Sequence, residues 1–358
     1  MRVRALVGLV VAATVCGLLL PAGSPSAAPG ASSTYWNPVF PRDFPDPFVL
    51  AEGDLLHAYA TNGWGGNIQV LSSTDGASWR AFGDALPSLP AWAAPGRTWA
   101  PALLKVGSRY VLYFTARHRT AKIPCIGAAT APSARGPFRD PAPHPVMCQP
   151  DRGGSIDPSP FVERDGSRWL LWKSEGIPLR EPTRIWAQRL DATGTAVTGR
   201  PAMLLTQDLP WEEPIIENPS MVRFGDRLLL LYSAGRWQTA GYSVGWAACH
   251  SPAGPCTKSG EQLLRSTGPV AGPGGQEVFR RPDGTTWIAY HAWTAGKVGY
   301  PHGARSLRID KLGLVGGRPF VGSPTWWPAS LTGDPSSPAV TLSPATAGDG
   351  YRVVTARG

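Results

Sequence analysis

Three acidic residues are each followed closely by a proline and open a strand-like run. They are Asp46 in "FPDPFVL", Asp157 in "SIDPSPFV" and Glu217 in "IIENPSMV". A single Asp-Pro pair is common in surface turns. Three such carboxylates held together, with no metal or nucleophile signature beside them, favour acid–base hydrolysis of the kind that cleaves glycosidic bonds. One group would donate a proton, one would activate water, and the third would adjust the proton balance.

A repeat along the chain predicts how these acids are positioned. Five segments combine a turn glycine with an apolar strand: "GDLLHAYAT", "GSRYVLYFTA", "GSRWLLWKS", "GDRLLLLYSA" and "GTTWIAYHA". Their first glycines are Gly53, Gly107, Gly166, Gly225 and Gly284, separated by 54, 59, 59 and 59 residues. A period of this length, with several strands in each unit, is typical of propeller blades. The sequence therefore predicts an all-β protein, a five-bladed β-propeller.

The acids recur at one phase of this repeat. Asp46, Asp157 and Glu217 lie seven, nine and eight residues before the turn glycine of their units. We therefore expect them at equivalent positions of the first strand of each blade. First strands line the axis of a propeller, so the three carboxylates should meet in one pocket. Like charges held close raise the pKa of at least one group, and a turn-forming aspartate would need no counterpart in other blades.

Four segments make up the predicted chain. Residues 1–28 have the basic start, short apolar run and small residues of a secretory signal peptide. Residues 29–35 form a short linker, and residues 36–328 form the propeller catalytic domain. The tail, 329–358, either completes the last blade or trails as a flexible end. We expect a secreted protein with no membrane association after the signal is removed.

Charge and cysteine content add to this picture. The formal net charge is +9, and it falls to +7 without Arg2 and Arg4 of the signal. No Lys/Arg cluster marks nucleic-acid binding, so no nucleic-acid partner is expected. Four cysteines remain after the signal, which in an exported chain indicates disulfides. We expect the local pairing, Cys125–Cys148 and Cys249–Cys256.

Longer motifs resemble a known family. "NPVFPRDFPDPFVL", "RTWAPALL", "SIDPSPFVERDGSRWLLWKSEG", "IIENPSMVRFGDRLLLLYSAG" and "GPGGQEVF" followed by "WIAYHAW" are similar, in order and spacing, to the blade motifs of glycoside hydrolase family 43. The likeness runs from about Trp36 to about Pro328. It implies an inverting enzyme in which Asp46 is the general base, Glu217 the general acid, and Asp157 the residue that raises the pKa of the acid and orients it. Inversion implies about 6.5–9.5 Å between the base and acid carboxyls.

The resemblance also implies roles for three further residues. Trp99 in "RTWAP" would stack on a sugar ring, or else pack between blades. Arg305 in "GARSLRI" would point into the pocket, or else form a surface ion pair. His291 in "AYHAW" would lie near a central calcium ion or water, or else in the core. Gly275 stands where the family often has a histidine, which argues against calcium; no cofactor is required, and a structural calcium stays possible.

Some neighbouring acids compete with these assignments. Asp43 is a rival for the base, although it precedes the strand. Glu212 and Glu213 compete with Glu217, but lie in the loop "PWEEP" and are expected at the rim.

The leading functional prediction is an exo-acting hydrolase of the α-L-arabinofuranosidase/β-xylosidase type. It would remove α-L-arabinofuranosyl or β-D-xylosyl residues from plant cell-wall polysaccharides. Its partners would be polysaccharides or oligosaccharides that contain arabinose or xylose. Two alternatives stay open: an endo-arabinanase, and a catalytically inactive propeller that binds carbohydrate.

Overall fold

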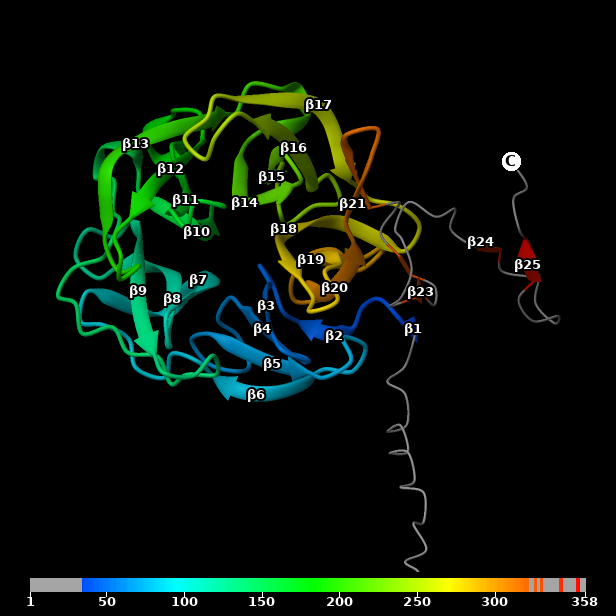
Figure 1. Ribbon diagram of the computed structural model, residues 1–358, viewed down its shortest axis with the longest axis horizontal. Helices are drawn as coiled ribbons and strands as arrows, with labels where there is room; N and C mark the ends of the chain where they lie inside the picture. The colour runs from blue at the N-terminus through cyan, green and yellow to red at the C-terminus, as the bar shows by residue number, and fades with distance from the viewer. Residues whose placement is uncertain (1–33, 322–324, 327–328, 331–340, 344–351, 355–358) are drawn as a thin grey trace, which may run out of the picture. The chain divides into compact units, whose positions relative to one another are not determined.

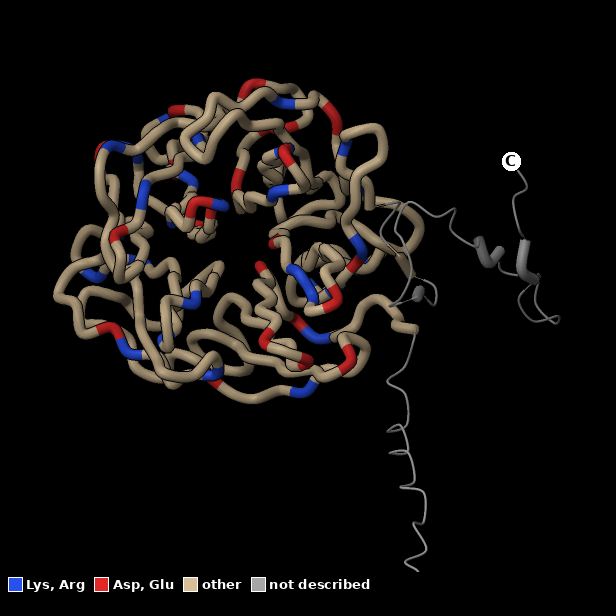
Figure 2. Tube along the Cα trace, in the orientation of Figure 1, with Lys and Arg blue, Asp and Glu red and all other residues tan. Residues whose placement is uncertain are grey.

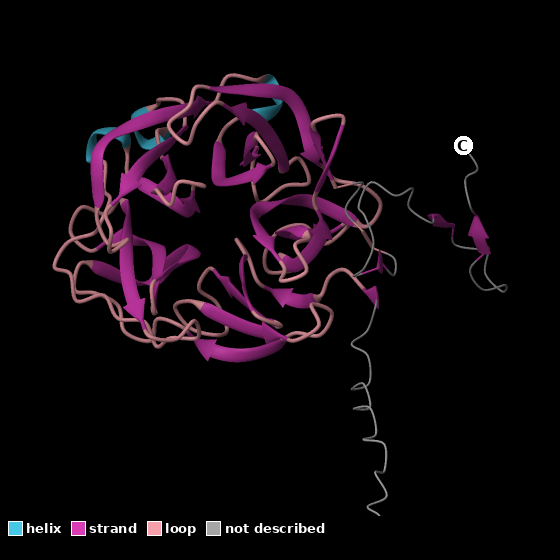
Figure 3. Ribbon diagram, viewed as in Figure 1, coloured by secondary structure: helices cyan, strands magenta, loops and turns pink. Residues whose placement is uncertain are grey.

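Five antiparallel sheets stand around a central axis in the computed structural model, which confirms the five-bladed β-propeller (Figure 1). The structure describes residues 34–321, 325–326, 329–330, 341–343 and 352–354. The expected signal peptide, 1–28, and residues 29–33 of the expected linker lie outside these residues. Strands make up the greater part of the described chain, and its helices are three short 3-10 turns (Figure 3).

Each blade is one sheet, and in the first four blades the strands follow the order of the sequence from the axis outwards. The first contains β3 (Phe48–Glu52), β4 (Leu55–Ala60), β5 (Gln69–Ser73) and β6 (Arg80–Asp84). The second contains β7 (Ala93–Val106), β8 (Arg109–His118) and β9 (Pro124–Ala131). The third contains β10 (Ser155–Val162), β11 (Arg168–Ser174), β12 (Arg184–Leu190) and β13 (Val197–Thr206). The fourth contains β14 (Ile216–Phe224), β15 (Arg227–Ala234), β16 (Ser243–Cys249) and β17 (Cys256–Leu264).

The fifth blade joins the two ends of the ring. It contains β18 (Val270–Arg280), β19 (Thr286–Thr294) and β20 (Ser306–Lys311), and its fourth strand is β2 (Phe40–Asp43) from before the first blade. In the register, Phe40 pairs with Leu307 and Asp43 with Ser306. The last blade is thus completed by an N-terminal strand, not by the tail, so closure of the ring depends on hydrogen bonds between segments far apart in sequence.

Strands outside the blades are short. In the tail, β23 (Ala329–Ser330) pairs with β1 (Thr34–Tyr35), and β24 (Thr341–Ser343) pairs with β25 (Arg352–Val354). A further hairpin joins β21 (Gly313–Val315) to β22 (Arg318–Phe320). The 3-10 turns are η1 (Pro150–Arg152), η2 (Ile177–Leu179) and η3 (Pro210–Glu212). Among the residues described, no helix has the length and apolar character needed to cross a membrane.

The core consists of the faces between neighbouring blades. Side chains alternate across a strand, so one strand can serve two interfaces. In β15, Leu228 and Leu230 pack toward the third blade, and Leu229 and Leu231 toward the fifth. Five buried clusters of this kind fill the five interfaces in turn. A single blade buries neither face alone, which explains why the chain needs the full ring.

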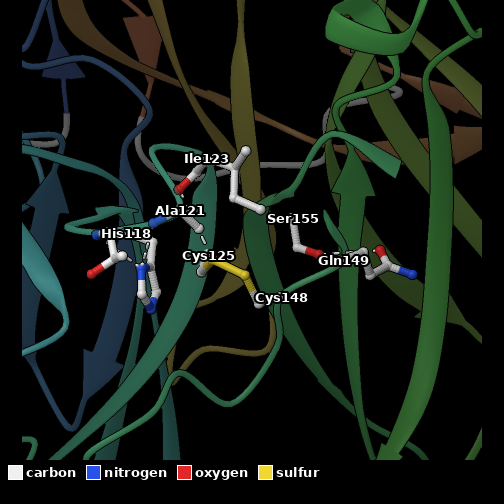
Figure 4. The surroundings of a disulfide bond; sticks show 8 residues. His118, Ala121, Ile123, Cys125, Cys148, Gln149 and Ser155 are labelled. Carbon is white, nitrogen blue, oxygen red and sulfur yellow. Dashed lines mark hydrogen bonds between the residues drawn. A yellow bond between two sulfur atoms is a disulfide. The ribbon is translucent and has the colours of Figure 1, made fainter. Parts of the chain in front are cut away.

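Both expected disulfides are present, Cys125–Cys148 and Cys249–Cys256. Figure 4 shows the first, which joins β9 to the segment that enters the third blade. Next to Cys148, the Oε1 atom of Gln149 accepts hydrogen bonds from Ser155 Oγ (3.1 Å) and Trp172 Nε1 (2.8 Å). The cross-link therefore fixes a segment that is bonded to the first two strands of the third blade.

Candidate active site

Each blade has a residue with positive φ at an equivalent point, just before its innermost strand in the first blade and within that strand in the others. These residues are Asp46 (53°), Ala100 (45°), Asp157 (61°), Asn218 (48°) and Gly275 (59°). In the first four blades the next residue is proline, which has no N–H to donate to a sheet. The pairing register shifts at this point in the second to fifth blades. The break turns each residue out of the sheet at the axis.

The register corrects one sequence prediction. Glu217 is not equivalent to Asp46 and Asp157, because the positive-φ residue of its blade is Asn218. Glu217 stands one residue earlier, opposite Ser233, just as Trp99 stands opposite Thr115. Spacing to the turn glycine cannot reveal this offset, since the turn-side part of the strand varies in length. Two aspartates thus project from the break, and one glutamate from regular strand before it.

All three carboxylates line one cleft of about 630 Å³. The prediction that distant acids converge is therefore confirmed by the geometry. Figure 2 shows acidic positions at the inner ends of several strands, around the centre of the ring. Trp99 and Arg305 line the same cleft, together with Glu175, Trp237 and Tyr300. On the axis, a smaller cavity of about 20 Å³ is lined by the break residues and those that follow them, and has room for about one water.

The Asp46 carboxylate is contacted by Thr61 and Arg305. Thr61 Oγ1 donates a 2.6 Å hydrogen bond to Asp46 Oδ2. Arg305 Nη1 lies 3.6 Å from Oδ1, which places a permanent cation beside the carboxylate. The side chain keeps 15% exposure toward the cleft. A carboxylate fixed in this way, with solvent access, can hold and activate a water molecule.

Glu217 has a different environment. Its Oε1 accepts a 2.8 Å hydrogen bond from Tyr242 Oη, and its Oε2 lies 3.1 Å from Lys173 Nζ. Lys173 is 2% exposed and also lies 3.2 Å from Glu175 Oε2. Burial opposes the charge on Lys173, but Glu217 and Glu175 outweigh it and raise the pKa of the lysine. The ammonium therefore stays charged against Glu217.

Asp157 lies beneath the cleft and is 6% exposed. Burial, and then the neighbouring Glu217 carboxylate, raise its pKa well above the ordinary value, while Lys173 acts in the opposite direction. Its Oδ2 accepts a 3.0 Å hydrogen bond from the backbone N–H of Asn218, next to Glu217. Asp157 is thus bonded to the strand that carries Glu217.

Arg305 sits in an aromatic frame on the cleft wall. Its guanidinium carbon lies 4.3 Å from the centre of a Trp237 ring, and its Nε donates to Tyr300 Oη at 3.2 Å. Only 7% of the residue is exposed, so it is not a surface arginine. Asp43 accepts hydrogen bonds from Tyr300 Oη (2.7 Å) and from the Arg305 backbone (2.8 Å). This rival for the base is therefore occupied in holding Arg305 and Tyr300 in place.

His291 is fully buried behind Asp46, not on the cleft wall. Its Nδ1 accepts the Asp46 backbone N–H at 3.0 Å, so the neutral ring carries its hydrogen on Nε2. Burial lowers its pKa well below the usual value, which keeps the ring neutral. A protonated Nε2 suits a water and does not fit a metal ion. Among the described residues no group of three His, Cys, Asp or Glu side chains could hold a metal.

Gly275 explains why no larger residue accompanies this histidine. A Cβ at this position would lie 2.4 Å from His291 Nδ1 and 2.8 Å from Asp46 Oδ1, and the φ of +59° also favours glycine. The absence of a second histidine thus follows from close packing against Asp46 and His291.

The two glutamates of the loop, Glu212 and Glu213, differ in their exposure to solvent. Glu213 is exposed, as expected for the rim. Glu212 is fully buried, so its expected place at the rim is wrong. Its Oε1 accepts from Tyr232 Oη (2.8 Å), and its Oε2 lies 2.7 Å from Lys258 Nζ. The buried ion pair holds this loop against the fourth blade.

Sequence reasoning missed three residues that contact the acids, Thr61, Lys173 and Tyr242. It also missed three that line the cleft beside them, Glu175, Trp237 and Tyr300. One of these residues, Lys173, could have been recognised from the sequence. Lys173 is a cation inside the apolar strand "WLLWKS", where other units have threonine, serine or histidine. The others lie in segments whose position depends on the tertiary fold.

The fold and the site define a class: five-bladed propellers with acid–base carboxylates in an axial cleft. A family model described as Glycosyl hydrolases family 43 matches residues 35–317, and the chain belongs to this family. It is accordingly a glycoside hydrolase.

Three relatives illustrate the similarity. The chain is 27% identical over 320 residues to the Probable arabinan endo-1,5-alpha-L-arabinosidase A of Aspergillus flavus, covering 82% of this chain and 94% of that protein. It is 24% identical over 334 residues to the Extracellular endo-alpha-(1->5)-L-arabinanase 1 of Bacillus subtilis, covering 86% and 95%. A solved thermostable family-43 glycoside hydrolase superposes with a TM-score of 0.75 at 25% identity, covering 85% of this chain and 100% of that one.

Proposed function

We propose that the protein is a secreted, inverting glycoside hydrolase that cleaves pentosyl linkages of plant cell-wall polysaccharides. Its substrates would carry α-L-arabinofuranosyl or β-D-xylosyl residues. The observation that carries the proposal is the contrast between Asp46 and Glu217. They share one cleft, but Asp46 is held by Arg305 and Thr61, whereas Glu217 is held beside Asp157 and Lys173.

In this mechanism Asp46 is the general base. Arg305 and Thr61 hold and orient its carboxylate, so that it takes a proton from the attacking water. Glu217 is the general acid and gives its proton to the leaving oxygen. Asp157, bonded to the backbone next to Glu217, holds the strand that carries the acid. Trp99, Trp237 and Tyr300 offer aromatic faces on which sugar rings stack.

The leading form of the proposal is removal of single terminal pentose residues. A second candidate, internal cleavage of linear arabinan, is supported by the printed names of the two curated relatives above. Secretion rests on the signal-like residues 1–28, the two disulfides and the extracellular relative. Structural calcium is not part of the proposal, given the His291 geometry.

The test is hydrolysis of 4-nitrophenyl α-L-arabinofuranoside, 4-nitrophenyl β-D-xylopyranoside and linear arabinan by the wild type, Asp46→Asn and Glu217→Gln. We expect the wild type to be active and each variant to lose at least about 10²-fold in kcat. NMR of the first-formed sugar should show the inverted anomer. Monosaccharide as the first product indicates terminal action, and oligosaccharides indicate internal cleavage. Wild-type levels of activity in both variants would refute the site.

A further inference from the structure

Resting on the proposed role of Glu217 as the acid, we propose that Lys173 and Glu175 are positioning residues that set how readily Glu217 keeps its proton. The single ammonium of Lys173 is shared between the two carboxylates. When Glu217 is neutral, Glu175 forms the ion pair with the ammonium. When both glutamates are ionised, they compete for the same ammonium.

Lys173 occupies a position at which the other four blades share one hydrogen bond that a lysine cannot form. In the other four blades the equivalent side chain accepts the backbone N–H of the next blade's break residue. Thr61 accepts from Ala100 (3.0 Å), Thr115 from Asp157 (3.1 Å), Ser233 from Gly275 (2.8 Å) and His291 from Asp46 (3.0 Å). An ammonium has no lone pair and cannot accept.

The consequence of the lysine is visible one blade further on. Since Lys173 cannot accept from the Asn218 N–H, this donor bonds to Asp157 Oδ2 instead. Lys173 pairs with Ile156 in the register, so it stands directly behind the strand that carries Asp157. A lysine in place of a hydrogen-bond acceptor at this position thus places a cation against Glu217. It also leaves the Asn218 N–H free to bond to Asp157.

The charges of this cluster account for the proposed effect. Burying an ammonium is costly unless it is paired, and Lys173 is 2% exposed. It lies 3.1 Å from Glu217 Oε2 and 3.2 Å from Glu175 Oε2. With both glutamates ionised the cluster carries one net negative charge, and with Glu217 protonated it is neutral. Without Glu175, a protonated Glu217 would leave the buried ammonium unpaired.

Other charged groups also lie near Glu217, and one of them, Asp157, is affected by Lys173, which lowers its pKa against the opposing effects of burial and Glu217. Asp157 on β10 and Asp46 lie on the same cleft, Glu277 follows the break in β18, and Arg305 faces Asp46. Tyr242 donates to Glu217 and stacks on neutral His291, with ring centres 5.8 Å apart. At the start of β12, Arg184 is paired with Glu181. Glu175→Gln therefore reports most directly on the shared ammonium, whereas Lys173→Met also removes a cation that lowers the pKa of Asp157.

The experiment is the pH profile of kcat/KM for Glu175→Gln and Lys173→Met. Removing Glu175 leaves the ammonium wholly to Glu217 and should move the alkaline limb to lower pH. Removing Lys173 should move it to higher pH. We expect roughly one pH unit in each case, in opposite directions. Lys173→Arg should keep the limb near the wild type, and Glu181→Gln, at the exposed pair with Arg184, is the matched control.

A second readout does not need activity. In protein labelled with ¹³C at glutamate side chains, the carboxyl resonance lost in Glu217→Gln reports the titration of Glu217 directly. The same opposite displacements are expected there. If the wild type hydrolyses no glycoside, the proposed function fails while this titration still tests the pair. If Lys173→Met does not fold, Glu175→Gln decides alone: an unmoved or upward-shifted titration overturns the proposal.

Discussion

Thr61 Oγ1 lies between Asp46 and the backbone of the next blade, donating to Asp46 Oδ2 at 2.6 Å and accepting from Ala100 N–H at 3.0 Å. Ala100 has φ of 45°, a conformation that costs an alanine about 1 kcal/mol. One hydroxyl thus orients the proposed base and satisfies a strained backbone position. Catalytic geometry and blade packing are coupled at this residue.

Thr61→Val should therefore impair both activity and stability. The variant leaves the Ala100 N–H without its acceptor and Asp46 without its donor. We expect the free energy of unfolding to fall by about 2 kcal/mol and kcat to fall at least tenfold. Ser233→Ala is the matched control, because Ser233 accepts the Gly275 N–H in the same way but does not contact Asp46. It should lose stability with a smaller change in kcat; equal losses of kcat would contradict the role of the Asp46 contact.

Tyr242→Phe should weaken the acid without disturbing the base. The hydroxyl donates to Glu217 Oε1, and a hydrogen bond of this kind favours the ionised carboxylate. Its loss should move the alkaline limb of kcat/KM to higher pH, and lower kcat about tenfold through poorer orientation. Tyr59→Phe is the control, since that equally buried hydroxyl donates to Ala134 O in the first interface. A displaced limb in the control as well would count against a local effect at Glu217.

Glu277 predicts a dependence of stability on pH. Burial raises its pKa to about 7 from an ordinary 4.5. A raised pKa means that the folded state prefers the protonated form. The associated stability is present below about pH 4.5 and is lost as pH rises to about 7. Relative to the wild type, Glu277→Gln should gain about 2 kcal/mol between pH 5 and pH 8 in urea unfolding.

Glu163→Gln gives a control of opposite sign for that measurement. A hydrogen bond from Arg223 lowers the pKa of Glu163, so this group stabilises the fold above its ordinary pKa and loses that effect as pH falls. The variant should be less stable than the wild type at pH 8. A flat difference between Glu277→Gln and the wild type across the range would show that Glu277 is ionised freely in the folded protein.

The two disulfides should contribute unequally to the free energy of unfolding. Cys125–Cys148 spans 23 residues and Cys249–Cys256 spans 7. Loop-closure entropy predicts about 3.5 kcal/mol for the first and about 2.5 kcal/mol for the second. Paired Cys→Ser variants should show this order in urea unfolding. Loss of the first should also lower kcat, since it fixes the segment of Gln149 (Figure 4); a reversed order would indicate that entropy is not the main contribution.

The sequence by itself determined the number of blades, the convergence of the acids and the disulfide pairs. These features are local or periodic. An apolar strand after a turn glycine, such as "RLLLLYSA", recurs in every unit at intervals of 54 or 59 residues, and paired cysteines lie close in the chain. A period of 59 residues leaves the first strands of all units at one axis, so distant carboxylates must meet there.

Only the tertiary structure decided the register of Glu217, the strand that completes the last blade and the partners of Glu212. Each depends on contacts between distant segments. The offset of Glu217 follows from where the positive-φ break falls, at Asn218, and a break in the strand is not visible in its spacing to a turn. The pairing of Lys173 with Glu217 spans 44 residues, and no local pattern records it. Charge placement inside the ring is therefore fixed by how neighbouring blades meet.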